Sequence, residues 1–177
     1  MSHIDDKVIE LARTALGFQF GGEHFFRHAS KMTRNASGKA MFLRLAEKDN
    51  DRMDDMHSLF GAIMGNDLWR RLVAEEAANA NPSKVVADME TEVARRGHGA
   101  VADDTQALRL AMELVRRIIH VYKDLAFKIN DQEVITLIGK IIESECFQYD
   151  NLQAQLDSVL NTGMWLDKPE FRMDGKF

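Results

Sequence analysis

The chain carries two copies of one helix-like pattern, 96 residues apart. In the first copy, residues 42–63, apolar side chains recur every three or four residues, which is the spacing of one helix face. Apolar residues occupy most of the equivalent positions in the second copy, residues 138–159. Both copies place polar side chains inside the apolar stripe: Asp49 and Arg52 in the first, Glu145 and Gln148 in the second. Because charges at core positions are costly unless paired or used, the interruption indicates an inward-facing site shared by two helices.

The same shift relates the segments that precede the two copies. Phe26 corresponds to Tyr122 and Gln19 to Val115, so the repeat extends over two helices in each half. We expect long helices over residues 5–34, 39–64, 105–130 and 132–160, with turns at "RNASGK" and "NDQE". Two equivalent hairpins joined by a long crossover predict a four-helix bundle with pseudo-twofold symmetry.

The remaining segments are a crossover and a tail within a single domain, residues 1–177. The crossover, residues 65–103, contains patterns for two short helices, one ending before Pro82 and one running from Ser83 to Gly97. Residues 161–177 include Gly163 and Pro169, so we expect an extended tail. Its aromatic residues would be buried against the bundle or a second subunit: Trp165, Phe171 and Phe177.

Composition excludes several classes of function. A net charge of −5 without a basic cluster argues against a nucleic-acid surface. No run of about 18 apolar residues is present, so no membrane span is expected. Cys146 is the only cysteine, which leaves neither an internal disulfide nor a paired-cysteine metal site. With no signal-peptide pattern, a cytoplasmic protein is expected, and the tail and the wide apolar face of the first helix suggest a homodimer.

Two segments resemble the rubrerythrin-like branch of the ferritin-like superfamily, over roughly residues 8–160: "FFRHASKMTRNASGKAMFLRLAEKDNDR" and "VYKDLAFKINDQEVITLIGKIIESECFQ". The resemblance implies an all-α ferritin-like four-helix bundle. It also implies a metal-binding oxidoreductase ancestry, in which two irons support peroxide or oxygen chemistry. In that family one Glu comes from each of the first and third helices, and a Glu-x-x-His from each of the second and fourth.

The family's metal ligands carry over poorly to this chain. The six positions fall at Gln19, Asp49, Arg52, Val115, Glu145 and Gln148. Two keep a carboxylate and no histidine survives, which is too few donors for a dinuclear iron site. The paired-cysteine rubredoxin module is also missing. Glu23, one turn beyond Gln19, would either shift a metal along the bundle or be a buried carboxylate bonded to a polar neighbour. The metal candidates are therefore Gln19, Glu23, Asp49, Glu145 and Gln148, with iron or another divalent ion.

Arg52 places a permanent cation among the six positions at which the family has its metal ligands. We hypothesise that its guanidinium replaces the metal charge and pairs with Asp49 and Glu145. Three functions stay open: an altered metal enzyme, a metal-free structural or interaction protein, and a small-ligand binder that uses the space left by the irons. No catalytic residue is assigned.

Other polar residues receive simpler interpretations. Tyr122 is expected to be a core residue with a hydrogen-bonded hydroxyl. His24 and His120 are expected at the surface or at a subunit interface, whereas the spacing of His24 and His28 would suit a weak exposed metal site.

Overall fold

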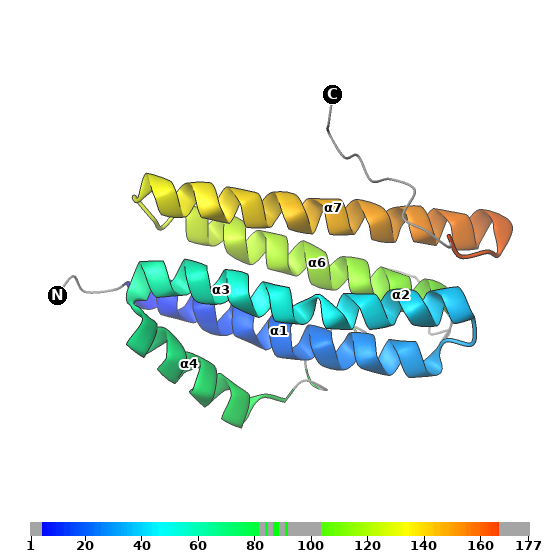
Figure 1. Ribbon diagram of the computed structural model, residues 1–177, viewed down its shortest axis with the longest axis horizontal. Helices are drawn as coiled ribbons and strands as arrows, with labels where there is room; N and C mark the ends of the chain where they lie inside the picture. Colours follow the sequence, from blue (N-terminus) through cyan, green and yellow to red (C-terminus); the bar gives the residue numbers. More distant parts are fainter. Residues whose placement is uncertain (1–4, 82–83, 85–86, 89–90, 92–103, 167–177) are drawn as a thin grey trace.

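Two helical hairpins packed side by side make up the protein (Figure 1). The computed structural model describes residues 5–81, 84, 87–88, 91 and 104–166, and all regular structure in this part of the chain is α-helical. Each hairpin pairs long helices that follow one another in the sequence. The helices are α1 (Asp6–Met32), α2 (Ala36–Glu47), α3 (Asp49–Met64), α4 (Asn66–Asn79), α6 (Asp104–Ala126) and α7 (Gln132–Thr162). An all-α helical bundle, as the sequence predicts, is therefore present.

Contacts between the hairpins close the bundle. The first hairpin consists of α1 packed against α2 and α3, and the second of α6 packed against α7. α1 also packs on α6, and α3 packs on α7, so the two apolar faces meet in one core. Fully buried side chains from five of these helices fill the core: Leu16, Phe26, Phe42, Met56, Leu59, Leu108, Leu114, Leu125 and Ile138.

The two hairpin turns are equivalent under the 96-residue shift. Asn35 precedes α2, and its side-chain oxygen accepts hydrogen bonds from the backbone N–H groups of Ser37 and Gly38. Asp131 precedes α7 and caps it in the same way, accepting from Glu133 and Val134. Side-chain caps of this kind satisfy backbone donors that a helix leaves unpaired at its N-terminus. The second helix of each hairpin therefore begins at equivalent residues.

The expected continuous helix over residues 39–64 is interrupted at one residue, Lys48. α2 ends at Glu47 and α3 begins at Asp49, although Lys48 keeps right-handed helical dihedrals. The Arg52 N–H still bonds the Lys48 carbonyl, so the chain continues in the same direction. The sequence around the break, "KDND", is rich in Asp and Asn, whose short polar side chains compete with helical hydrogen bonds. The helix is thus distorted one turn before Arg52.

α4 lies outside the bundle, against α1 and α3. Gly65 makes the sharp turn into α4 with a positive φ of 84°, a conformation that glycine adopts at little cost. Trp69 of α4 stacks on Phe60 of α3, with 4.8 Å between ring centroids. Arg13 of α1 forms ion pairs with two adjacent carboxylates of α4, Glu75 and Glu76. The second short helix expected in the crossover lies largely outside the described residues.

The chain after α7 turns back onto the bundle. α7 extends to Thr162, two residues beyond the predicted end, and Gly163 caps it in the left-handed conformation. Trp165 is buried, as the sequence suggests, with its ring 5.7 Å from that of Phe42. Its indole N–H donates to Asp104 at the start of α6. Phe171 and Phe177 lie outside the described residues, and the homodimer stays a prediction.

Candidate functional site

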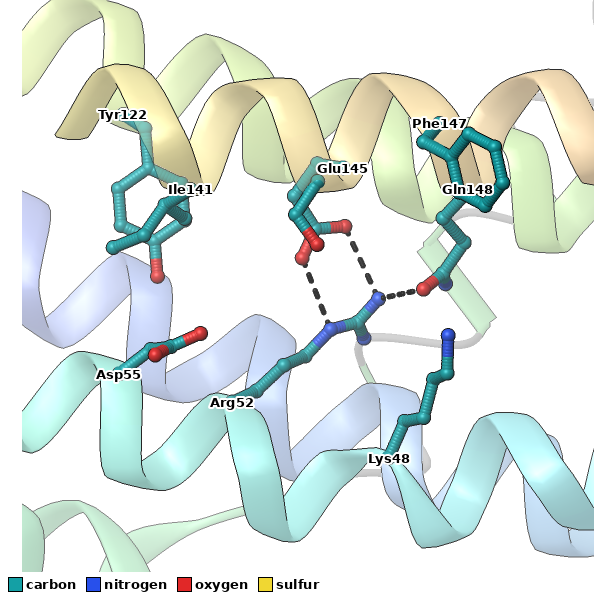
Figure 2. Close-up of a pocket in the computed structure, with 9 residues that line it drawn as sticks. Lys48, Arg52, Asp55, Tyr122, Ile141, Glu145, Phe147 and Gln148 are labelled. Carbon is teal, nitrogen blue, oxygen red and sulfur yellow. Dashed lines mark hydrogen bonds and ion pairs between the residues drawn. The ribbon is translucent and has the colours of Figure 1, made fainter. Parts of the chain in front are cut away.

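Arg52 reaches across from α3 to contact two residues of α7 (Figure 2). Its Nε lies 3.0 Å from Glu145 Oε1, and its Nη2 donates to Glu145 Oε2 at 3.1 Å. The same Nη2 donates to Gln148 Oε1 at 2.7 Å. Because Glu145 and Gln148 are three residues apart on a helix, they project from one face and meet a single guanidinium. The predicted ion pair between Arg52 and Glu145 is present.

This ion pair lies almost wholly out of solvent. The side chain of Arg52 is 13% exposed and that of Glu145 only 6%. Burial raises the pKa of the Glu145 carboxyl above its ordinary value, because desolvation disfavours its charged form. The charge and hydrogen bonds of Arg52 oppose that rise. Without the guanidinium, the Glu145 carboxylate would be buried without a contacting cation. Arg52 therefore offsets the free-energy cost of burying this charge.

A cavity of about 140 Å³ opens beside the ion pair, between α3, α6 and α7. Its lining combines charged, polar and apolar side chains from all three helices. The lining residues are Lys48, Arg52, Asp55, Tyr122, Ile141, Ser144, Glu145, Phe147 and Gln148. Polar groups that converge on a concave site provide orientation for a bound molecule, while apolar walls provide contact area. The cavity can therefore accommodate a small ligand with both polar and apolar parts.

Tyr122 is 96% buried, and its hydroxyl points into this cavity (Figure 2). Burial and the nearby charge of Glu145 raise the pKa of the phenol far above its ordinary value, so the hydroxyl stays protonated at physiological pH. The expected burial of Tyr122 is confirmed, whereas the expected hydrogen bond of its hydroxyl is not seen among the described residues and stays a prediction. There the hydroxyl meets the cavity and no protein partner. It is free to donate to, or accept from, a bound molecule.

Gln148 supplies a second polar group without a partner at the opposite end of the cavity. Its amide oxygen accepts from Arg52, which fixes the amide orientation and leaves Nε2 as a donor. That nitrogen is buried and has no hydrogen-bond partner. A buried donor without an acceptor costs about 1–3 kcal/mol of stability. Such a donor is therefore expected at a place where a bound molecule supplies the acceptor.

The other candidate metal-ligand residues lie in different environments. Gln19 and Val115 are both buried, as expected for inward positions on α1 and α6. Glu23 is only partly buried and pairs with Arg27 one turn along α1, so it is neither a buried carboxylate nor part of the cavity. Asp49 begins α3, but its side chain lies outside what the structure describes. The predicted pairing of Asp49 with Arg52 therefore stays a prediction.

The four histidines that the structure describes contribute no imidazole to the cavity lining. His24, His28 and His120 are exposed, as the sequence suggests, and His57 is half-buried on α3 without lining the cavity. His98 lies outside the described residues. Arg116 lies within 3.5 Å of His120 on the surface of α6.

These donors do not fit the family's dinuclear iron centre. Iron in such sites is held by several carboxylates and two imidazoles. Within the described part of the chain, no group of three or more His, Cys, Asp or Glu residues is placed to hold a metal. Both oxygens of Glu145 already face Arg52, and the inward position on α6 is held by the apolar Val115. A metal at Glu145 would have to displace the guanidinium of Arg52 from both carboxylate oxygens.

Three polar lining residues are not among the candidates that the sequence predicts: Lys48, Asp55 and Ser144. Lys48, Arg52 and Asp55 follow one another at spacings of four and three residues, so they share one face of the helix. Ser144 precedes Glu145 on α7 and lines the same cavity. The spacing was visible in the sequence, but Lys48 and Asp55 are exposed residues that resemble an ordinary solvated helix surface. Only the packing of α7 on α3 assigns them to a cavity.

Comparison with protein-family models, curated proteins and solved structures finds no match for this chain. Among the described helices, none combines the length and apolar character that crossing a membrane requires.

Proposed function

We propose that this protein is a ferritin-like bundle that binds a small molecule beside a buried arginine, and that the arginine replaces the charge of the lost metal centre. The observation that carries the proposal is the engagement of both Glu145 oxygens by Arg52 at the edge of an open cavity. A bundle that kept inward carboxylates after losing its metals would suffer repulsion between them. A fixed cation removes that repulsion without a cofactor.

The residues at the other family positions support the replacement of the metal. Gln19 and Val115 are neutral and buried where the family has two metal-binding carboxylates. Gln148 stands at one histidine position and accepts a hydrogen bond from Arg52 instead of offering an imidazole. Negative charge has thus been removed and positive charge added in the same region. This is the combination expected when a metal of high charge is no longer bound.

Two unpartnered polar groups support ligand binding. The hydroxyl of Tyr122 and the buried amide nitrogen of Gln148 both belong to residues that line the cavity, and neither has a described protein partner. A purely structural core would be expected to satisfy such groups or to replace them with apolar side chains. Their presence beside an open cavity favours a binding role over a structural one.

Elemental analysis by mass spectrometry tests the metal part of the proposal. Untagged protein purified without chelators is expected to contain well below one iron, manganese or zinc per chain. The matched variant restores the family's donors through Gln19→Glu, Val115→Glu, Arg52→His and Gln148→His, and is expected to gain metal. Because four buried changes endanger folding, the single variant Arg52→His is measured alongside, with metal-dependent melting as its readout. Near-stoichiometric metal in the unaltered protein would overturn the replacement of metal by arginine.

A thermal-shift screen tests the binding part. A library of small polar metabolites is measured against the unaltered protein and against Ser144→Phe, which fills the cavity from its wall. At least one compound is expected to raise the melting temperature of the unaltered protein and to leave that of the filled variant unchanged. If no compound separates the two proteins, the cavity is not a binding site.

A further inference from the structure

The cavity has charges of opposite sign at its two ends. Lys48 and Asp55 are seven residues apart, which on a helix is a separation of about 10 Å along the axis. Figure 2 shows Lys48 extending toward the Gln148 amide, and Asp55 lying below the Tyr122 hydroxyl, with Arg52 between them. Neither Lys48 nor Asp55 forms an ion pair with another described residue. The cavity is therefore polarised along its length.

The Lys48 end offers only hydrogen-bond donors. Lys48 and Gln148 both line this end, and the Gln148 amide nitrogen is buried with no acceptor within the described protein. Two donors that face the same space repel one another unless an acceptor lies between them. A carboxylate supplies two negatively charged acceptor oxygens and would form charge-assisted hydrogen bonds with both. This end selects an anion.

The Asp55 end offers acceptors. Asp55 is a carboxylate, and the Tyr122 hydroxyl, held protonated, can direct an oxygen lone pair toward a donor. An ammonium group has three donors and no acceptor, so it suits this pair. The carboxylate of Asp55 would repel an anion at the same position. This end therefore selects a cation, the reverse of the other end.

The middle of the cavity carries no net charge. Arg52 and Glu145 cancel one another, and Ile141 and Phe147 add apolar wall. A ligand that matches all three regions has a carboxylate, a short apolar spacer and an ammonium, with zero net charge. A cavity of 140 Å³ is similar in size to one that holds benzene, so the ligand has on the order of six to eight non-hydrogen atoms.

We infer that the cavity binds a short ω-amino acid, with its carboxylate between Lys48 and Gln148 and its ammonium between Asp55 and Tyr122. This inference rests on the proposed binding function of the cavity. The carboxylate and the ammonium account for about four of the roughly six to eight non-hydrogen atoms, which leaves about two to four methylenes between them. An α-amino acid cannot place its two charged groups at both ends, because they are attached to one carbon.

Calorimetric titration with four related compounds tests the inference. 5-Aminopentanoate carries both charges, pentanoate only the carboxylate, pentylamine only the ammonium, and glycine both charges on one carbon. We expect 5-aminopentanoate to bind at least about tenfold more tightly than each of the other three. Equal affinity for pentanoate or for pentylamine would overturn the two-ended arrangement.

Charge-neutralising variants test which end holds which group. Lys48→Met is expected to weaken 5-aminopentanoate about five- to tenfold and to leave pentylamine unaffected. Asp55→Asn is expected to weaken 5-aminopentanoate similarly and to leave pentanoate unaffected. Both residues are exposed, so these variants should fold. The matched controls are Lys140→Met and Asp54→Asn, which remove exposed charges from α7 and α3 outside the cavity lining and should change nothing.

The metabolite screen separates failure of this inference from failure of the binding function. If 5-aminopentanoate does not bind but another compound distinguishes the unaltered protein from Ser144→Phe, the ω-amino acid assignment is wrong and the binding function stands. If neither 5-aminopentanoate nor any library compound binds, both are wrong. Binding that is unchanged in Ser144→Phe would locate the ligand elsewhere and overturn the assignment to this cavity.

Discussion

Arg52 and Glu145 meet through two separate contacts, with Nε opposite one carboxylate oxygen and Nη2 opposite the other, at 3.0 and 3.1 Å. The residues are 93 positions apart and belong to α3 and α7, so the pair joins the two hairpins. Engagement of both oxygens fixes the planes of the two groups as well as their separation. A metal bound at Glu145 would need the same two oxygens. The contact that joins the hairpins therefore also occupies this carboxylate as a metal ligand.

Removing Arg52 should destabilise the protein strongly. In Arg52→Met the Glu145 carboxylate keeps its buried position but loses the guanidinium that contacts both of its oxygens, and we expect a loss of about 3–5 kcal/mol in the free energy of unfolding. Urea unfolding followed by circular dichroism measures this loss. The control is Arg27→Met, which breaks the exposed pair with Glu23 and should cost about 1 kcal/mol or less.

The double variant Arg52→Met, Glu145→Met separates pairing from packing. Because neither residue then leaves a charge behind, we expect most of the lost stability to return. A double variant as unstable as Arg52→Met would mean that the cost comes from lost packing around Arg52 and not from an unpaired carboxylate.

The cost of Arg52→Met should depend on pH. Burial raises the pKa of the Glu145 carboxyl in the folded chain above its ordinary value of 4.5. At a pH between the ordinary and the raised pKa, the folded chain therefore binds more protons than the unfolded chain. The contribution of Glu145 to the free energy of unfolding therefore falls as the pH rises through that window. Removing Arg52 raises the folded pKa further and extends the window upward. The difference between variant and unaltered protein should thus be small near about pH 4 and grow toward about pH 8 in urea titrations. A difference independent of pH would indicate that Glu145 titrates alike in both proteins.

The bundle could be predicted from the sequence because its signals are local and repeated. The apolar stripe recurs after 96 residues, and the capping residues Asn35 and Asp131 recur at the same interval. Helix ends were predicted to within a few residues where such caps or Gly163 mark them. The break at Lys48 was not predicted, because the apolar stripe continues through it and only weak propensities oppose the helix.

The site could be predicted only in part. Arg52, Glu145 and Gln148 stood out because they are polar residues in an apolar stripe, and that signal needs no partner. Lys48 and Asp55 carry no such signal, since exposed charges are common on helices. The position of Glu23 was also undetermined, because a residue at the edge of a stripe turns either to the core or to solvent. Its pairing with Arg27 depends on side-chain choices that periodicity does not encode.

Trp165 should hold the end of the bundle together. It is 7% exposed, lies against Phe42 and donates to Asp104, whose other oxygen accepts from Thr33. Trp165→Ala should therefore cost about 3–5 kcal/mol. Trp165→Phe keeps an aromatic ring but loses the hydrogen bond to a carboxylate, and should cost about 1.5–3 kcal/mol. Chemical denaturation measures both. Met164→Ala, at a neighbouring residue that is 65% exposed, is the control and should stay within about 0.5 kcal/mol of the unaltered protein.

The position of Trp165 should also explain why residue 38 is a glycine. A Cβ at Gly38 would lie 2.6 Å from Trp165 Cε2, and the buried indole has little room to move away. Alanine is favoured over glycine inside a helix by about 1 kcal/mol, yet we expect Gly38→Ala to be destabilising by about 1–3 kcal/mol because overpacking outweighs propensity. Gly139→Ala in α7 is the matched control: its Cβ would meet no atom within 4 Å, so it should stabilise by about 0.5–1 kcal/mol. In the Trp165→Ala background the clash is absent, and Gly38→Ala should become neutral or stabilising there. A penalty that persists in that background would place its origin in the backbone of α2 and not in the tryptophan.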